Sequence, residues 1–457
     1  MKNQILSKKS ALFVTSSGVF LVPFMASSVN IALPSIGKEF SLDAVLISWI
    51  STSYLLTTAI LLVPFGRIAD LYGRKKIFFN GFLLFTLSSL IAGLSHSALM
   101  LIASRILQGV GGAMIFSTAT AILTSIFPEG ERGKALGINV ASVYMGLSLG
   151  PFLGGLLTEH WGWRSPFLAT VPWGTWMLIA IFWKLKGEWA EARGEKFDRL
   201  GAILYGFTLA LILAGFTLLP RLIGTGLVCT GILGLAIFIR WEGKVRNPVL
   251  NLNLFRHNRI FALSNLAALI HYNATFGVGF MLSLYLQYVK GLSPFHAGWI
   301  LVCQPVMQAF FSPFAGRLSD RLEPRIVASL GMSFSVIGLF FLIFLQRHTS
   351  LGFIITSLLI LGTGFALFSS PNTNAIMSSV EKRFYGVSAG TVATMRLIGQ
   401  SLSMGLIILV FNVYLGPVAI TAAIYPLFLK SIQIVFTLFA SLCIGGIFAS
   451  LARGKVR

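Results

Sequence analysis

Charged residues are scarce in this sequence. Of its 457 residues only 11% are Asp, Glu, Lys or Arg, whereas 56% are hydrophobic. Soluble globular proteins carry about a quarter charged residues. The composition therefore excludes an ordinary soluble protein and indicates a chain that crosses a membrane several times, with little mass outside it.

Cysteine and acidic residues are also few. Cys229, Cys303 and Cys443 all fall within apolar runs, so no disulfide framework is expected. The 14 Asp and Glu residues all lie in loops or at the ends of apolar runs, so no carboxylate is expected in the middle of the membrane.

The motifs of the common hydrolases are absent as well. The sequence has no H-E-x-x-H, no P-loop and no pair of acids within an apolar run. We therefore expect no enzyme, no metal ion and no organic cofactor. Without an ATPase motif, any transport would draw its energy from an ion gradient, for which protons are the expected ion.

Long apolar runs are what the sequence has in abundance. A membrane-spanning helix needs about 20 mostly apolar residues. Fourteen stretches meet this criterion, namely 11–33, 46–65, 77–95, 99–126, 135–157, 165–185, 200–219, 222–240, 258–287, 295–316, 326–346, 351–377, 386–413 and 430–452. An even number of spans puts both termini on one side of the membrane.

The basic residues indicate which side that is. Loops on the side of the termini hold 27 of the 35 Lys and Arg residues, the opposite side holds six, and two lie inside spans. Cytoplasmic loops carry such an excess. We therefore expect a multi-pass protein of the cytoplasmic membrane with both termini in the cytoplasm. The same asymmetry accounts for the net charge of +21, so we do not expect a nucleic-acid partner.

The longest cytoplasmic connections bracket two spans, 200–219 and 222–240. Removing this pair leaves six spans on each side, which predicts a 6 + 2 + 6 arrangement. The expected domains are residues 1–186, a six-helix bundle; 187–257, a two-helix insert; and 258–457, a second six-helix bundle.

One polar loop, residues 66–76, separates the second and third spans. It reads G-R-I-A-D-L-Y-G-R-K-K, and residues 316–321 repeat its first part in the second half. Gly66 and Gly73 allow a tight reversal, and Asp70 can sit near a helix N-terminus and pair with a neighbouring base. Arg74, Lys75 and Lys76 would anchor the cytoplasmic face, and repeated halves are typical of transporters. The loop resembles the signature loop of the major facilitator superfamily. The resemblance implies an all-α polytopic fold in which two bundles rock about a central site.

Two further spans carry polar or glycine-rich patterns of the same superfamily. Arg105, followed by Gln108, lies inside the fourth span, where charge is costly, so it should face a polar cavity or a partner. The pattern resembles the superfamily's conserved-arginine helix, which is linked with proton coupling; the alternative is an Arg that binds carbonyls of a neighbouring helix. The fifth span resembles the antiporter motif and carries Gly146, Gly150, Pro151, Gly154 and Gly155, although such glycines also serve simple helix packing.

The first span, at residues 30–36, resembles the opening helix of the fourteen-span drug:proton antiporters. Residues 370–372 and 386–400 resemble the later spans of that family, so the resemblance covers the chain. Met25 stands where the family usually has an Asp. With no acid in mid-span, we expect the coupling or substrate residues among Arg105, Arg396, His271 and Asp70. His271 titrates near neutral pH when unperturbed, but a neutral packing histidine is the alternative.

A substrate cavity would be lined by polar and aromatic residues within the spans. The candidates are Asn30, Gln108, Asn139, Tyr144, Trp173, Tyr272, Asn273, Phe276, Gln304, Gln308, Asn372, Asn374 and Gln400. A cavity with two Arg and no acid should disfavour lipophilic cations and tolerate neutral or anionic amphiphiles.

The expected function is proton-coupled efflux of amphiphilic small molecules by a monomeric secondary transporter. Its partners would be a small-molecule substrate and the lipid bilayer. The alternatives are an importer or facilitator of a neutral or anionic metabolite and, less favoured, a receptor or scaffold without transport.

Overall fold

The computed structural model describes residues 2–185, 187–190, 192, 194–245, 252–381, 385–416 and 418–454. Within these ranges the chain is helical and has no β-strand. Met1, Lys186 and Arg457, which bound the predicted domains, lie outside the described residues. The helices are α1 (Lys2–Glu39), α2 (Ala44–Tyr72), α3 (Arg74–Gly93), α4 (Ala98–Ile126), α5 (Glu129–Trp161), α6 (Ser165–Lys184), α7 (Arg199–Leu218), α8 (Leu222–Glu242), α9 (Leu252–His257), α10 (Arg259–Leu284), the π-helical turn η1 (Tyr285–Val289), α11 (Pro294–Leu301), α12 (Cys303–Arg321), α13 (Pro324–Ile343), α14 (Leu351–Ser378), α15 (Tyr385–Tyr414), the 3₁₀ turn η3 (Ala422–Ile424) and α16 (Tyr425–Ala452).

Thirteen helical segments in the described ranges are long and apolar enough to cross a membrane. This confirms an all-helical polytopic membrane protein. The remaining expected span, 295–316, is two helices, α11 and α12, which meet at Val302. Pro305 contributes to this break because it has no N–H to donate to the carbonyl of Leu301, four residues earlier. The count of fourteen and the 6 + 2 + 6 division therefore remain predictions.

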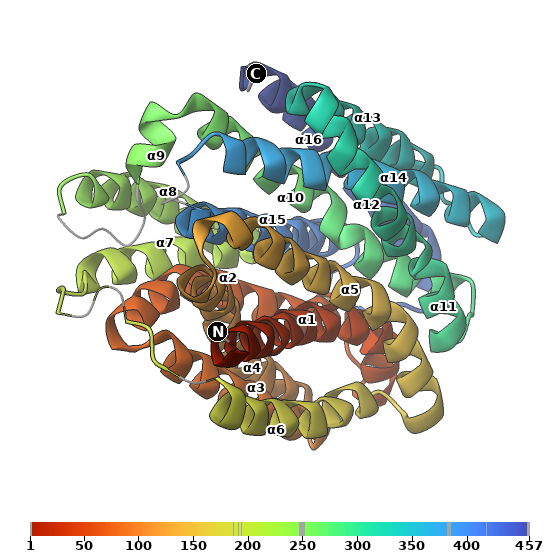
Figure 1. The fold of residues 1–457 in the computed structure, drawn as a ribbon. Helices are drawn as coiled ribbons and strands as arrows, with labels where there is room; N and C mark the ends of the chain where they lie inside the picture. The colour runs from red at the N-terminus through yellow and green to blue at the C-terminus, as the bar shows by residue number, and fades with distance from the viewer. Residues whose placement is uncertain are drawn as a thin grey trace.

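The helices form two halves that face each other (Figure 1). In the N-terminal half α5 packs along α1, and α4 packs against α2 and α3; in the C-terminal half α14 packs against α12 and α13, and α15 and α16 pack against α10. The pair α7 and α8 packs together, and α7 also contacts α2 of one half and α15 of the other. The pair therefore lies beside the junction of the halves.

Short polar residues define where several helices begin. The side chains of Asp43, Ser97 and Ser350 accept hydrogen bonds from backbone N–H groups in the first turns of α2, α4 and α14. Such residues satisfy N–H groups that a helix leaves unpaired at its start. Between α2 and α3 the chain reverses at Gly73, whose φ of 115° favours glycine.

Two of the hydrogen bonds between the halves lie on the side of the molecule away from the N-terminus. Gln287 Nε2 donates to the Ile31 carbonyl at 3.0 Å, and Ser283 Oγ donates to the Asn30 carbonyl at 2.8 Å. These bonds join the end of α10 and the turn η1 to the second half of α1. We call this the distal side; under the predicted orientation it is the outer side of the membrane.

Candidate functional site

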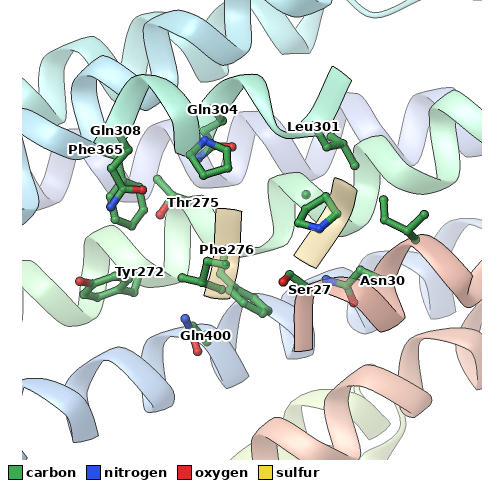
Figure 2. A pocket seen from close by; sticks show the side chains of 15 residues that line it. Ser27, Asn30, Tyr272, Thr275, Phe276, Leu301, Gln304, Gln308, Phe365 and Gln400 are labelled. Atoms are coloured by element: carbon green, nitrogen blue, oxygen red, sulfur yellow. The ribbon is translucent and has the colours of Figure 1, made fainter. Parts of the chain in front are cut away.

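A central cavity lies between the two halves (Figure 2). It comprises about 780 Å³ of space not filled by protein atoms, part of which is open to the solvent. Its walls come from α1, α5, α10, α11, α12, α14 and α15, so both halves contribute. The lining residues are Ser27, Asn30, Ile31, Leu147, Pro151, Tyr272, Thr275, Phe276, Gly279, Leu301, Gln304, Pro305, Gln308, Phe365 and Gln400.

None of the described residues that line the central cavity carries a charge. Aliphatic and aromatic side chains make up much of it, and the polar groups are amides and hydroxyls. Figure 2 shows Gln308, Tyr272 and Phe365 toward one end and Ser27, Asn30 and Leu301 toward the other. The site can therefore offer hydrogen bonds and stacking surfaces, but no countercharge.

Several residues expected at the cavity do line it. Asn30, Tyr272, Gln304 and Gln400 lie on its wall, together with Phe276 and Gln308. Among the lining residues that the sequence reasoning did not select are Ser27, Thr275 and Phe365. Ser27 and Thr275 each donate to a carbonyl four residues earlier in their own helices, a local pattern that gives no sign of a cavity.

Arg105 and Gln108 lie inside the N-terminal half instead of on this wall. Arg105 is fully buried, donates through Nε to the Ile50 carbonyl at 3.2 Å and bonds through its guanidinium to Gln108 Oε1. Its guanidinium also lies 4.2 Å from the centre of the Tyr54 ring, which gives a cation–π contact. These contacts join α4 to α2. They agree with the alternative stated above, in which Arg105 binds a carbonyl of a neighbouring helix.

His271 is likewise buried within the C-terminal half. Its Nε2 lies 3.2 Å from Ser335 Oγ, and its ring stacks on Phe368 with a centroid distance of 4.0 Å. Its Nδ1 is buried and has no hydrogen-bond partner among the residues that the structure describes. Neighbouring Asn273 is also buried, with its Oδ1 unpaired. Neither residue lines the central cavity, so a coupling role for His271 remains a prediction.

Arg396 occupies a smaller side cavity that adjoins the central one. The side cavity shares Leu147, Phe276 and Gln400 with the central cavity and also includes Arg396. The Arg396 guanidinium lies 5.5 Å from the centre of the Phe116 ring, in the other half of the molecule. Among the described residues, Arg396 is the charged residue that lines the side cavity.

Tyr144 joins the halves on the side of the central cavity nearer the N-terminus. Its hydroxyl lies 3.0 Å from the Tyr272 hydroxyl and also bonds to Ser369 Oγ. Tyr144 and Tyr272 both meet the ring of Phe365 edge-on. These side chains therefore connect the two halves at this end of the cavity.

The glycine-rich segment of α5 makes two different contacts. A Cβ added at Gly146, Gly150 or Gly154 would lie within 3.0 Å of an α1 atom, so these glycines allow α5 to lie directly on α1. Gly155 faces Pro294 of the other half, and the carbonyl of Pro151 lies where a Cβ on Gly298 would stand. The segment thus both packs within its half and closes the cavity on the distal side.

Residues 66–76 lie at the opposite end of the molecule. They were expected to form a loop, but they are helical except at Gly73, where α2 ends and α3 begins; we keep the name loop 66–76 for this corner. Arg74 forms an ion pair with Asp70 at 2.7 Å and donates to the Ala121 carbonyl on α4 at 3.0 Å. Gly73 makes the reversal, and Gly66 faces Ser117 of α4 without a close approach. The loop therefore ties together the ends of α2, α3 and α4, far from the central cavity.

A segment after α6 binds this loop, which the sequence did not reveal. The Glu188 carboxylate accepts from the backbone N–H groups of Lys75 and Lys76 at 2.8 and 3.2 Å, and so caps the start of α3. Arg74 N donates to the Trp189 carbonyl at 2.9 Å, and the Ala192 N–H donates to the Asp70 carbonyl at 3.1 Å. We call residues 187–190, 192, 194 and 195 the docked linker.

Known proteins share this sequence and fold. The model of the Major Facilitator Superfamily matches residues 15–404 and 265–454. The riboflavin transporter RibZ of Clostridioides difficile is 32% identical over 84% of each chain, and the multidrug resistance protein Stp of Mycobacterium tuberculosis is 31% identical over 87% of this chain and 74% of its own. A crystal structure of the peptide transporter POT in complex with sulfate superposes with a TM-score of 0.71, and the match covers 97% of this chain and 95% of the other. The two sequences are 14% identical, so this similarity shows the fold alone. The chain belongs to the Major Facilitator Superfamily and is a membrane transporter, not an enzyme.

Proposed function

We propose that the protein exports small uncharged amphiphilic molecules by alternating access, driven by a proton gradient. The observation that carries the proposal is the central cavity itself, which both halves line and which has no charged group among the described residues of its wall. Moving a charge from water into such a cavity without a partner is costly. Neutral molecules therefore suit the site better than lipophilic cations.

The distal contacts support the conformational part of this proposal. Ser283, Gly298 and Pro151 belong to the contacts that join the halves on that side of the cavity. In a carrier of this kind the two halves rock about the site, so these contacts must break when the cavity opens to the distal side. The excess of Lys and Arg in the predicted loops supports a cytoplasmic position for the termini.

Export is supported by a relative and by a motif. The matched protein from Mycobacterium tuberculosis is named for multidrug resistance, and the α5 glycine segment resembles the antiporter motif. Protons are proposed as the coupling ion, with Asp70 and His271 as the groups to test. We propose that the transporter works as a monomer.

Uptake of a neutral or anionic metabolite is the second candidate function. A metabolite as substrate is supported by the similarity to a protein named as a riboflavin transporter, a name that gives no direction. Arg396 in the side cavity would also suit an anionic group placed beside Gln400. This candidate uses the same cavity and differs in direction and substrate.

Flux in proteoliposomes of known orientation tests both candidates. Riboflavin, rhodamine 6G and 8-anilinonaphthalene-1-sulfonate serve as neutral, cationic and anionic probes, each under a pH gradient of either sign. We expect gradient-driven flux of the neutral probe toward the distal side. Flux toward the terminal side would favour the uptake function instead, and flux of none of the three would count against transport of this class.

The same proteoliposomes test whether protons are the coupling ion. Asp70→Asn and His271→Ala should reduce pH-gradient-driven accumulation, whereas His348→Ala, in an exposed loop, should not. Accumulation that survives an ionophore that collapses the pH gradient would contradict proton coupling.

A further inference from the structure

Three glutamine side chains surround the middle and one end of the central cavity. Gln304 and Gln308 stand four residues apart on α12, which places them on one face of that helix. Gln400 comes from α15, and Figure 2 shows it on the other side of the cavity from Gln304. The three amides therefore approach a bound molecule from two directions.

Gln308 gives the strongest evidence that the central cavity binds a ligand. Its side chain is only 6% exposed, and its Nε2 is buried without an acceptor among the described residues. A buried N–H group without a partner costs free energy, so such groups are rare in folded proteins. A carbonyl oxygen of a ligand in the cavity would supply the missing acceptor.

Most of the other polar groups on the wall are already engaged, although no hydrogen bond within the described residues uses Asn30 Nδ2. The Tyr272 hydroxyl bonds to Tyr144, the Thr275 hydroxyl donates to the His271 carbonyl, and Asn30 Oδ1 accepts from Ser51. No hydrogen bond within the described structure involves the side chains of Gln304, Gln308 or Gln400. Hydrogen bonding toward a ligand therefore falls mainly to the three glutamines.

Aromatic rings complete the site. Tyr272, Phe276 and Phe365 line the same space as the glutamines, and Figure 2 shows Phe276 between Gln304 and Gln400. Aromatic faces favour stacked or edge-on contacts with flat rings. The cavity thus combines flat apolar surfaces with amides at the edges.

We propose that the central cavity selects uncharged, planar heterocycles whose edge carries neighbouring C=O and N–H groups, as in an imide or a lactam. The inference rests on the proposed transport function and names its substrate class. A carboxamide offers both an acceptor and two donors, which match such an edge. A cationic ring would find no countercharge among the described lining residues.

Binding to the purified full-length protein in nanodiscs tests this inference separately from flux. The probes are lumiflavin, which is neutral and has an imide edge; N3-methyl-lumiflavin, which lacks the imide N–H; flavin mononucleotide, which adds a phosphate; and ethidium, a planar cation. Isothermal titration calorimetry should give the tightest binding for lumiflavin and at least tenfold weaker binding for its N3-methyl derivative and for ethidium.

Matched variants locate the binding site. Gln308→Met keeps the length of the side chain and removes the amide, and should weaken lumiflavin binding at least tenfold. Gln433→Met makes the same change on α16, away from the cavity, and should have no effect. If Gln308→Met does not fold, as judged by gel filtration, Gln400→Met serves in its place with the same expectation.

Each outcome decides the proposal. Wild-type affinity for lumiflavin in both cavity variants would overturn it, and so would tighter binding of ethidium than of lumiflavin. Flavin mononucleotide as the tightest ligand would also overturn it, because that result would point to Arg396 and an anionic class of substrate. Flux of other compounds without lumiflavin binding would overturn this inference and leave transport standing. Lumiflavin binding without flux of any probe would overturn the transport function and leave the recognition standing.

Discussion

The hydroxyl of Ser283 on α10 donates to the carbonyl oxygen of Asn30 on α1, at 2.8 Å and across the two halves. Asn30 lies four residues before Pro34, which has no N–H to give to that carbonyl. The proline thus leaves an acceptor in α1 that the opposite half uses. A break in the hydrogen bonding of one helix becomes part of the contact that closes the cavity on the distal side.

Ser283→Ala should shift the protein toward the state that is open on the distal side. The net value of one such hydrogen bond is about 1 kcal/mol, which corresponds to about a fivefold change in population. The measurement is labelling of a Thr275→Cys reporter on the cavity wall by a membrane-impermeant thiol reagent added from the distal side. Cys229, Cys303 and Cys443 are replaced in the background.

Ser431→Ala is the control for this change. Its hydroxyl is also buried, but it donates to Leu427 within its own helix. The control should label at the rate of the parent. Equal labelling of the parent and the Ser283 variant would show that the bond does not hold the halves together.

Gly298→Ala should have a larger effect in the same assay. A Cβ at this position would lie 2.3 Å from the Pro151 carbonyl oxygen, so α11 and α5 must separate to accept it. Gly445→Ala, with no atom within 4 Å of the added Cβ, provides the matched control. Distal labelling as slow as in the parent would contradict the close approach of these two helices.

Arg105→Ala should abolish flux while the protein still inserts into the membrane. The change removes a charged hydrogen-bonding group from the Ile50 carbonyl and Gln108, and each such bond contributes about 1.5–3 kcal/mol. The assay compares flux in proteoliposomes with the amount of protein in the membrane fraction. Wild-type flux in this variant would refute the requirement for Arg105.

Glu188→Ala should release the docked linker from loop 66–76. A lost helix cap costs about 1 kcal/mol, so amide exchange at Lys75 and Lys76 should become about fivefold faster. Hydrogen–deuterium exchange measures this, with the Ser97-capped start of α4 as the internal reference. Unchanged exchange at α3 would mean that Glu188 does not stabilise this helix start.

The fold was largely predictable because its signals are local. Long apolar runs and the polar loop around Asp70 predicted a helical membrane protein of the superfamily. The region 295–316 was read as one span because its composition is apolar, and only the backbone shows the break at Val302.

The site was predictable only in part, because a polar residue in a span can face either a cavity or the inside of a bundle. Asn30, Tyr272, Gln304 and Gln400 reach the cavity, whereas Arg105, Gln108 and His271 find partners within their own halves. Sequence periodicity does not separate these cases when helices are covered on most sides. Glu188 escaped notice for another reason, since its partners lie more than 110 residues away.

The most direct test of a neutral, amide-lined substrate site compares the flux of riboflavin and rhodamine 6G in the same proteoliposomes. Wild-type protein should move riboflavin and leave rhodamine 6G behind, and Gln308→Met should reduce the riboflavin flux while Gln433→Met leaves it unchanged. Transport of rhodamine 6G in preference to riboflavin, unaffected by the Gln308 change, would contradict the account.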